Sequence, residues 1–318
     1  MKTAKGILYI ITAFVIVSCK KETEETTPQV TVNGYTSVTD FLSKNTPVLQ
    51  TYTISGVSGG SITSPQGTII NIPANAFLTQ AGIPVTGVVT IQFKDIYKKS
   101  DMVLADMSTM TNFSSPLKSG GEFFIKALSN NSALILDAGK RITVSQPGAL
   151  TGGLDSINVM QAFIKQDTLG QFGGWSPAPA DSVFYSASNY IFSLYQFNAP
   201  VDTGSWCNSD NSTYFSAYPQ TTLTLMPNDN VNSYGTEVFL VFKNISSMVH
   251  VYYEQSSSKF PYYYAPQGLQ CTLVAIGVKN GVVYSSFNPI TITANQSVNF
   301  TLSPTTTSAF ITQLNALN

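Results

Sequence analysis

His250 is the only histidine in the chain, so a site built from a serine, a histidine and an acid would have to use it. It lies in the segment Met248–Glu254, whose alternation is typical of a β-strand, between Val249 and Val251. Alternate strand residues point to opposite faces, so the two valines share one face and His250 is predicted to point to the other, solvated face. No Gly-x-Ser-x-Gly motif accompanies it, and no pair of acids stands out for glycoside cleavage. We expect no catalytic residues.

Residues that could bind a metal ion are scarce. One histidine and three cysteines are too few for a zinc or iron–sulfur site. The oxygen-rich stretches Asn208–Asn211 and Asn228–Asn230 could hold calcium, but neither matches an EF-hand, and turn formation explains both more simply. We therefore expect neither a metal site nor a cofactor.

A cluster of aromatic residues is the feature most typical of ligand binding. Tyr262, Tyr263 and Tyr264 are consecutive, and consecutive strand residues face opposite sides, so the three rings cannot all lie in the core. Exposed tyrosines suit sugar stacking or protein contact, because they are large and have few rotatable bonds. Trp206, on a Gly/Ser-rich loop, could join them. The alternative is a sheet that is simply rich in aromatic residues.

Two cysteines remain once Cys19 is assigned to the amino-terminal signal described below. Outside the cytoplasm, Cys207 and Cys271 are permitted to form a disulfide across the second predicted domain. Two unpaired, buried thiols are the other possibility, and the sequence leaves both open.

The elements that carry these residues are predicted to be β-strands. Of the 318 residues, 43% are hydrophobic, 12% aromatic and only 10% charged, and the formal net charge of −1 leaves no cationic excess to bind nucleic acid. Short segments alternate apolar and polar residues and are separated by Gly, Pro and Asn. Asn280-Gly281 is the strongest hairpin signal. The prediction is an all-β chain with two antiparallel β-sandwich domains.

The predicted organisation follows from these patterns. The segments are a signal peptide (1–18), a lipidated cysteine and flexible tether (19–48), a first sandwich (49–150), connecting strands and loops (151–205), and a second sandwich with a short C-terminal helix (206–318). Within the tether, Ser37–Lys44 could form one or two helical turns. The C-terminal helix is expected over Ser308–Leu317, where apolar residues fall on one face.

The amino end predicts a membrane anchor. Lys2 and Lys5 precede an apolar run, Ile7–Val17, that is too short to cross a membrane as a helix. The following Ile16–Cys19 resembles a bacterial lipobox, in which the cysteine thiol is acylated and becomes the first residue of the mature protein. The charged run Lys20–Glu25 resembles the export signal of Bacteroidota surface lipoproteins. These resemblances imply lipidation at Cys19 and a place on the outer membrane, facing the cell surface.

The first predicted sandwich carries the most specific pattern. Gly59–Ile62 and Gly67–Phe77 place glycines, a strand, an Ile-Pro pair and small or apolar residues in an order that resembles the opening of ZU5-type β-sandwich domains. A group of Bacteroidota lipoproteins is similar and continues, as here, with Gly87–Ile91, Lys99–Met102 and Ser119–Phe123. The resemblance covers about residues 50–148. It implies an interaction or scaffold module rather than an enzyme.

Three tripeptides resemble the Asp-Ser/Thr-aliphatic acceptor of O-glycosylation in Bacteroidota, and their acceptors are Ser156, Thr168 and Ser182. Taken together, the sequence predicts a lipid-anchored, non-enzymatic envelope protein that acts as a surface binding or adhesion module. Its expected partners are the membrane, through the lipid at Cys19, and a protein or glycan ligand. The alternative is a structural scaffold lipoprotein of the outer membrane that faces the periplasm.

Overall fold

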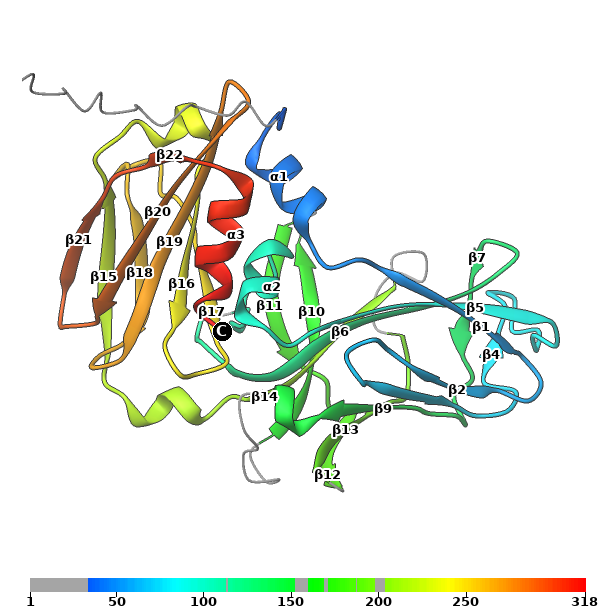
Figure 1. Ribbon diagram of the computed structural model, residues 1–318. Coiled ribbons are helices and arrows are strands. Elements are labelled where there is room, and N and C mark those ends of the chain that lie inside the picture. The colour runs from blue at the N-terminus through cyan, green and yellow to red at the C-terminus, as the bar shows by residue number, and fades with distance from the viewer. Residues whose placement is uncertain (1–33, 113, 152–159, 169–170, 187, 198–203) are drawn as a thin grey trace, which may run out of the picture.

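The structure, a computed structural model, describes residues 34–112, 114–151, 160–168, 171–186, 188–197 and 204–318, and of 160–168 and 171–173 it describes the backbone. Most of these residues lie in β-strands, which are arranged in two sandwiches joined by a region that carries the helices (Figure 1). The all-β prediction is confirmed. No helix among the described residues has the length and apolar character needed to cross a membrane.

The first sandwich contains most of the strands in the first two thirds of the chain. They are β1 (Gln50–Ser55), β2 (Gly60–Thr63), β3 (Ile69–Ile72), β5 (Val88–Ile96), β6 (Lys118–Ser129), β7 (Ser132–Ala133), β9 (Ile142–Pro147), β10 (Met160–Thr168), β11 (Gln171–Pro177), β12 (Ser182–Ser186), β13 (Asn189–Leu194) and β14 (Ser205–Asn211). One sheet has the order β1-β5-β6-β14-β10-β11, with β7 on β6, and the other has the order β12-β13-β9-β3-β2. Between them, Phe123 and Phe192 meet edge to face with ring centroids 5.1 Å apart. β4 (Phe77–Leu78) and β8 (Ile135–Leu136) pair separately.

The predicted boundary between the sandwiches needs correction. Residues 151–205 were expected to connect two domains, but β10 to β13 complete both sheets of the first sandwich. β14, expected to open the second domain at residue 206, instead pairs with β6 and β10 in the middle of the first sheet. The polar sequence of Asn208–Asn211 resembles a turn, and only its neighbours in the sheet make it a strand.

The second sandwich follows β14. Its strands are β15 (Gln220–Pro227), β16 (Glu237–Phe242), β17 (Met248–Val251), β18 (Phe260–Pro266), β19 (Gln270–Lys279), β20 (Val282–Thr291), β21 (Gln296–Phe300) and β22 (Ser303–Thr305). One sheet has the order β18-β15-β21 and the other β17-β16-β19-β20-β22. The β15–β21 pair is parallel, so this sandwich is not wholly antiparallel as predicted. Short 3₁₀ turns, η1 (Gly148–Leu150), η2 (Tyr214–Ala217) and η3 (Val231–Tyr234), lie in the connections.

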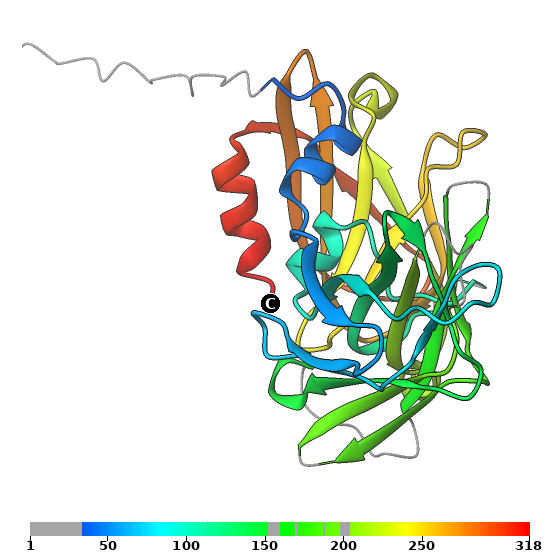
Figure 2. The same ribbon diagram turned by 90° about the vertical axis from the view of Figure 1, so that its right-hand side faces the viewer.

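Three helices cover the outer face of the larger sheet of the second sandwich. They are α1 (Val38–Asn45), α2 (Lys99–Leu104) and α3 (Thr307–Asn315), and α3 confirms the expected C-terminal helix. Figures 1 and 2 show α1 and α3 side by side along this sheet. Phe41 of α1 and Phe310 of α3 are fully buried, with ring centroids 5.4 Å apart. The helices and the sheet therefore form a third apolar core. Residues of the first sandwich belong to the same core as α2.

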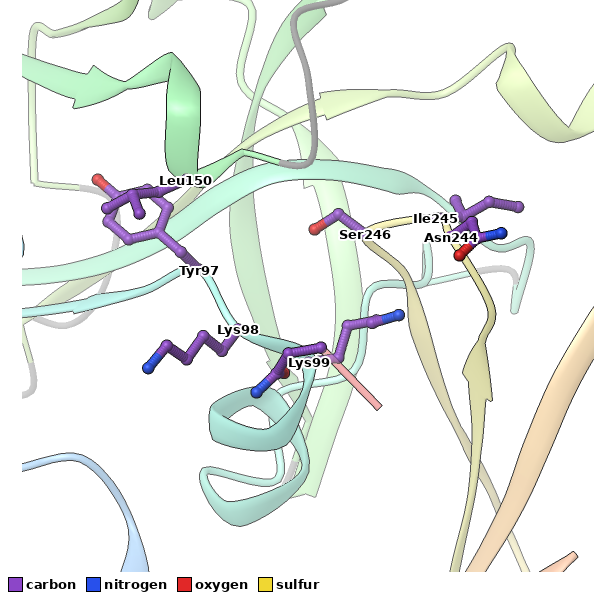
Figure 3. Close-up of a pocket in the computed structure, with 8 residues that line it drawn as sticks. Tyr97, Lys98, Lys99, Leu150, Asn244, Ile245 and Ser246 are labelled. Carbon is purple, nitrogen blue, oxygen red and sulfur yellow. The ribbon is translucent and has the colours of Figure 1, made fainter. Parts of the chain in front are cut away.

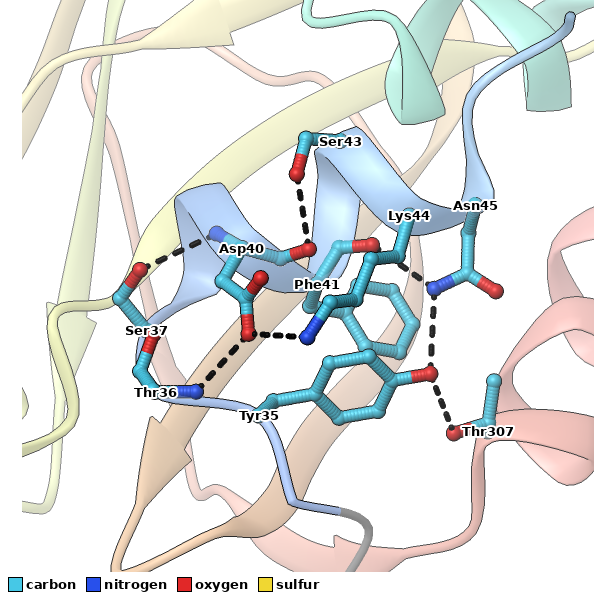
Figure 4. Close-up of polar contacts among 9 residues, drawn as sticks. All are labelled: Tyr35, Thr36, Ser37, Asp40, Phe41, Ser43, Lys44, Asn45 and Thr307. Carbon is cyan, nitrogen blue, oxygen red and sulfur yellow. Dashed lines mark hydrogen bonds and ion pairs between the residues drawn. The ribbon is translucent and has the colours of Figure 1, made fainter.

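Helix α1 lies inside the segment predicted to be a flexible tether. Ser37 caps it by accepting a hydrogen bond from the Asp40 backbone N–H at 3.0 Å, and the Asp40 carboxylate accepts from Lys44 at 2.9 Å (Figure 4). The Tyr35 hydroxyl lies 3.3 Å from Thr307, next to the start of α3. The chain is therefore part of the fold from about Tyr35 onward, so residues 35–48 do not belong to a flexible tether as predicted.

The two sandwiches are tied together by polar contacts as well as by the shared core. The Ser119 N–H of β6 donates to the Ser246 carbonyl at 2.7 Å, and the Thr109 N–H donates to the Met248 carbonyl at 2.7 Å. Trp175 of β11 is fully buried and donates from its indole nitrogen to the Ser108 carbonyl at 2.8 Å. The segment around residues 105–119 is thus held between the sandwiches, where it also covers the edge strand β17.

Candidate binding site

A pocket of about 290 Å³ opens where the edge strands of the second sandwich meet the segment around residue 112. β17 is the edge of one sheet and β18 the edge of the other, and residues 252–259 carry the chain between them. The walls therefore come from two elements that are neighbours in sequence and from one distant segment. The polar and aromatic residues that line it include Ser114, Tyr252, Glu254, Tyr263 and Tyr264.

The three consecutive tyrosines do not play one role. Tyr262 is 4% exposed and belongs to the core, which corrects its assignment as a binding residue. Its hydroxyl donates to the Ser114 carbonyl at 3.3 Å, so its edge forms part of the pocket wall. Tyr263 is 57% exposed and Tyr264 is 37% exposed, as expected for residues that could contact a ligand.

A β-bulge explains why two adjacent tyrosines are both exposed. In the β15–β18 pair, Thr221 lies opposite Ala265 and Leu223 opposite Tyr262, so the single residue between Thr221 and Leu223 faces two residues of β18. These two residues are Tyr263 and Tyr264. A bulge interrupts the strict alternation of a strand and re-aims the side chains at the extra position. The bulge therefore places both residues at the rim of the pocket.

Trp206 does not belong to this pocket. It lies on β14 in the first sandwich, where it is partly buried and packs on Phe124 with ring centroids 5.5 Å apart. The expected aromatic set is therefore corrected. Tyr252, which is 46% exposed, takes the third position instead.

His250 lies directly behind Tyr252 and is buried, not solvated as its alternation predicted. Only 5% of its surface is exposed, because the segment that contains Asp106 and Ser108 covers the outer side of β17. Its Nδ1 lies 2.8 Å from Asp106 and its Nε2 lies 2.8 Å from Glu237. Its ring stacks on that of Tyr252, with centroids 4.4 Å apart and 29° between the planes.

The protonation of His250 follows from this geometry. Burial by itself lowers the pKa of the imidazole, but the hydrogen bonds and negative charges of Asp106 and Glu237 outweigh burial and raise the pKa to about 9. Burial and the same two carboxylates raise the pKa of Tyr252 to about 12. At neutral pH the histidine is therefore a cation held on both nitrogens, and neither nitrogen is available to act as a base on a ligand. The pocket is suited to binding.

A second cavity, of about 230 Å³, lies between the sandwiches beside Tyr97 and the start of α2. Lys98 and Lys99 extend in opposite directions there and do not converge on one point (Figure 3). The Lys99 ammonium donates to the Phe242 carbonyl at 2.8 Å, and burial lowers its pKa to about 8. We interpret Lys99 as a structural residue whose hydrogen bond links the two sandwiches.

The two cysteines are free thiols, so of the two possibilities the structure has the unpaired one. Cys207 lies in the core of the first sandwich and Cys271 in that of the second. Burial raises the pKa of Cys207 well above its ordinary value and that of Cys271 to about 12. The disulfide, the other possibility, does not form because β14, which carries Cys207, belongs to the first sandwich.

The remaining predicted sites are placed as follows. Cys19 and Ser156 lie outside the described residues, and so does the side chain of Thr168 in β10. Ser182 is exposed at the start of β12. Among the described residues, no three His, Cys, Asp or Glu side chains are grouped to hold a metal ion.

Comparison of the chain with protein-family models, with curated proteins and with solved structures finds no match. The resemblance to ZU5-type domains stays a prediction.

Proposed function

We propose that this protein is a lipid-anchored, non-enzymatic cell-envelope protein that binds a glycan in the pocket formed by Tyr252, Tyr263 and Tyr264, which we call the tyrosine pocket. The observation that carries the proposal is the convergence of these three exposed rings on one cavity. Exposed aromatic rings cost free energy in water, and a folded chain that gathers three of them marks a surface for contact.

The tyrosine pocket has the chemistry that sugars need. A tyrosine ring offers an apolar face to the C–H face of a pyranose, and its hydroxyl offers a hydrogen bond at the edge. The Glu254 carboxylate lines the same cavity and can accept hydrogen bonds from sugar hydroxyls. One pocket therefore combines stacking surfaces with acceptors.

The backbone of the pocket and the ring of Tyr252 are held before a ligand arrives. The bulge in β18 fixes the backbone of Tyr263 and Tyr264, and the stack on His250 holds Tyr252. A side chain that is already ordered loses little entropy on binding, which favours affinity.

The size of the cavity favours a glycan over a protein as the ligand. At about 290 Å³ it lies near the lower end of ligand pockets, which run from roughly 300 to 1,000 Å³. A stable protein interface needs about 800 Å² from each partner, and the exposed aromatic residues of this region gather around one small cavity.

The anchoring part of the proposal rests on the lipobox-like Ile16–Cys19 and the charged run Lys20–Glu25. Residues 20–33 then separate the acylated cysteine from the first described residue, Gly34. Several acyl chains on Cys19 would hold the protein permanently, because each buried methylene contributes about 0.8 kcal/mol. The sandwiches would then project from the outer membrane.

The test is a glycan array probed with the purified protein, followed by titration of the best-bound glycan. We expect the Tyr263→Ala and Tyr264→Ala variants to lose about 10-fold in affinity each, as buried aromatic contacts in binding sites do. The matched control is Tyr185→Ala, because Tyr185 is 40% exposed but lies on β12 of the other sandwich. Equal binding by all variants, or binding to a protein and to no glycan, would refute the proposal.

A further inference from the structure

Two carboxylates are fully buried on adjacent strands at the centre of the first sheet. Glu122 lies on β6 and Asp210 on β14, and neither has any exposed surface. Asn208, also fully buried, is directly opposite Glu122 in the register, and Asp210 is opposite Ser119. Residues that are opposite one another project to the same face of a sheet, so Asn208 and Glu122 share one face.

Almost none of the side-chain polar atoms of this cluster has a hydrogen-bond partner among the described residues. Within the part of the chain whose side chains are described, none of the four carboxylate oxygens of Glu122 and Asp210 has a hydrogen-bond partner, and neither has the amide nitrogen of Asn208. The Ser119 hydroxyl is near Asp210, but it donates to Asn208 Oδ1 at 2.8 Å and accepts from the Gly121 N–H at 3.0 Å. Buried polar groups in folded proteins are nearly always paired, so the cluster needs an explanation.

No cation of the described chain supplies the missing partner. Glu122 and Asp210 form no ion pair with the described lysine, arginine or histidine side chains. Lys99, which is buried, donates to the Phe242 carbonyl in the other sandwich. Two carboxylates buried on adjacent strands repel one another when both are ionised, so the pair lacks a balancing positive charge.

We propose that Glu122, Asp210 and Asn208 bind a calcium ion. Two carboxylates supply two negative charges, which balance one divalent cation, and the Asn208 amide oxygen adds a neutral ligand. A calcium site does not require three carboxylates, because carbonyl oxygens serve equally well. The thiol of Cys207, the soft ligand nearest in sequence, faces the opposite side of β14 in the apolar core, so the donor set is made of oxygens.

One side chain must turn to complete the set. A rotation of the Asn208 carboxamide by 180° exchanges its oxygen and nitrogen, which have nearly the same shape. Oδ1 then faces the ion, and Nδ2 donates to the Ser119 hydroxyl oxygen in place of the present bond. The Ser119 hydroxyl is freed to donate to Asp210. Each previously unpaired atom thereby gains a partner.

The place of the site indicates what the ion does. Ser119 itself contacts the other sandwich, because its backbone N–H donates to the Ser246 carbonyl at 2.7 Å. The ion joins β6 to β14, the strand that completes the first sheet late in the chain. It is therefore a structural ion taken up on folding. The site is separate from the tyrosine pocket, so this inference goes beyond the proposed function and does not depend on it.

The test begins with the full chain, stripped of metal by a chelator and dialysed. We expect 1 mM calcium to raise its melting temperature by about 5 °C, and 1 mM magnesium to raise it much less, because magnesium parts with its water reluctantly. Elemental analysis after gel filtration should find about one calcium per chain. No shift and no retained calcium would overturn the proposal without the need for any variant.

Variants then locate the site. Glu122→Gln combined with Asp210→Asn removes both charges at constant shape, and the calcium-dependent shift should disappear. The matched control is Asp229→Asn in the other oxygen-rich stretch, Asn228–Asn230, which should keep the full shift. A shift that persists in the double variant, or that is lost in the control alone, would place the ion elsewhere and refute the assignment. A double variant that fails to fold is replaced by Glu122→Gln alone.

Discussion

The His250 cluster predicts a specific dependence of stability on pH. The folded protein holds the imidazolium between Asp106 and Glu237, which raises its pKa to about 9, against 6.5 for an ordinary histidine. A histidine whose pKa is higher in the folded state stabilises that state fully below pH 6.5. The contribution is lost as the pH rises from about 6.5 to about 9, because the folded protein must then give up a proton that it binds more tightly than the unfolded chain.

The size of the effect follows from the same values. One pKa unit corresponds to about 1.4 kcal/mol, so the difference amounts to roughly 3 kcal/mol. Asp106 and Glu237 are 43% and 36% exposed, and solvent screens part of their attraction for the imidazolium. We therefore expect about 2 kcal/mol of the free energy of unfolding to depend on His250 in this pH range.

The assay is urea unfolding of the wild type and of His250→Gln at several pH values between 6 and 9.5. The wild type should lose about 2 kcal/mol more than the variant over this range. Packing of the ring on Phe239 and Tyr252 is lost equally at every pH, so it changes only the offset between the two curves. Parallel curves, or a variant with the steeper fall, would show that His250 is not held as a cation in the folded protein.

Four further predictions follow from the placement of individual residues. Tyr262→Ala should reduce the free energy of unfolding by about 3–5 kcal/mol, whereas Tyr263→Ala should change it by less than about 0.5 kcal/mol, and thermal unfolding compares the two. Cys207 and Cys271 should resist a thiol reagent in the native protein and react in denaturant, and a reductant should leave the melting temperature unchanged. Cys19→Ala should abolish metabolic labelling with palmitate and release the protein from the membrane fraction. Protease shaving of intact cells, with a periplasmic protein as lysis control, should remove the protein, and protection until the outer membrane is opened would favour the periplasm-facing scaffold.

Local patterns in the sequence predicted the elements whose causes are local. Asn280-Gly281 predicted the β19–β20 hairpin, and both residues have the positive φ, 52° and 76°, that such a turn requires. Ser37 and Asp40 lie at the start of α1. Ser37 supplies the capping oxygen and Asp40 a negative charge in the first turn, so both signals lie within one turn of the sequence. These interactions need no partner from elsewhere in the chain.

The features that were missed depend on distant segments. The alternation around His250 distinguishes two faces of β17, but only the fold brings Asp106 and Ser108 over the second face. The exposure of both Tyr263 and Tyr264 depends on a bulge against β15, some forty residues earlier in the sequence. A signal for the candidate binding site was nevertheless present, because three consecutive tyrosines cannot all be buried in a regular strand.

Strand β14 shows most clearly that local sequence patterns do not predict what distant segments determine. Asn208–Asn211 has the composition of a turn, and the sequence alone therefore favoured a turn at these residues. Its neighbours β6 and β10 draw it into the centre of a sheet and bury its carboxylate. Tertiary context overrides local preference in such a strand. The buried polar groups that result are the ones that we propose bind calcium.

Binding of a glycan to intact cells would show whether the tyrosine pocket acts at the cell surface as we propose. Cells that display the wild type, the Tyr263→Ala/Tyr264→Ala double variant or Tyr185→Ala would be incubated with the fluorescent glycan selected on the array, with display measured by an antibody. We expect strong labelling of wild-type and Tyr185→Ala cells and at least a 10-fold loss for the double variant. Equal labelling of all three at equal display would contradict the proposal.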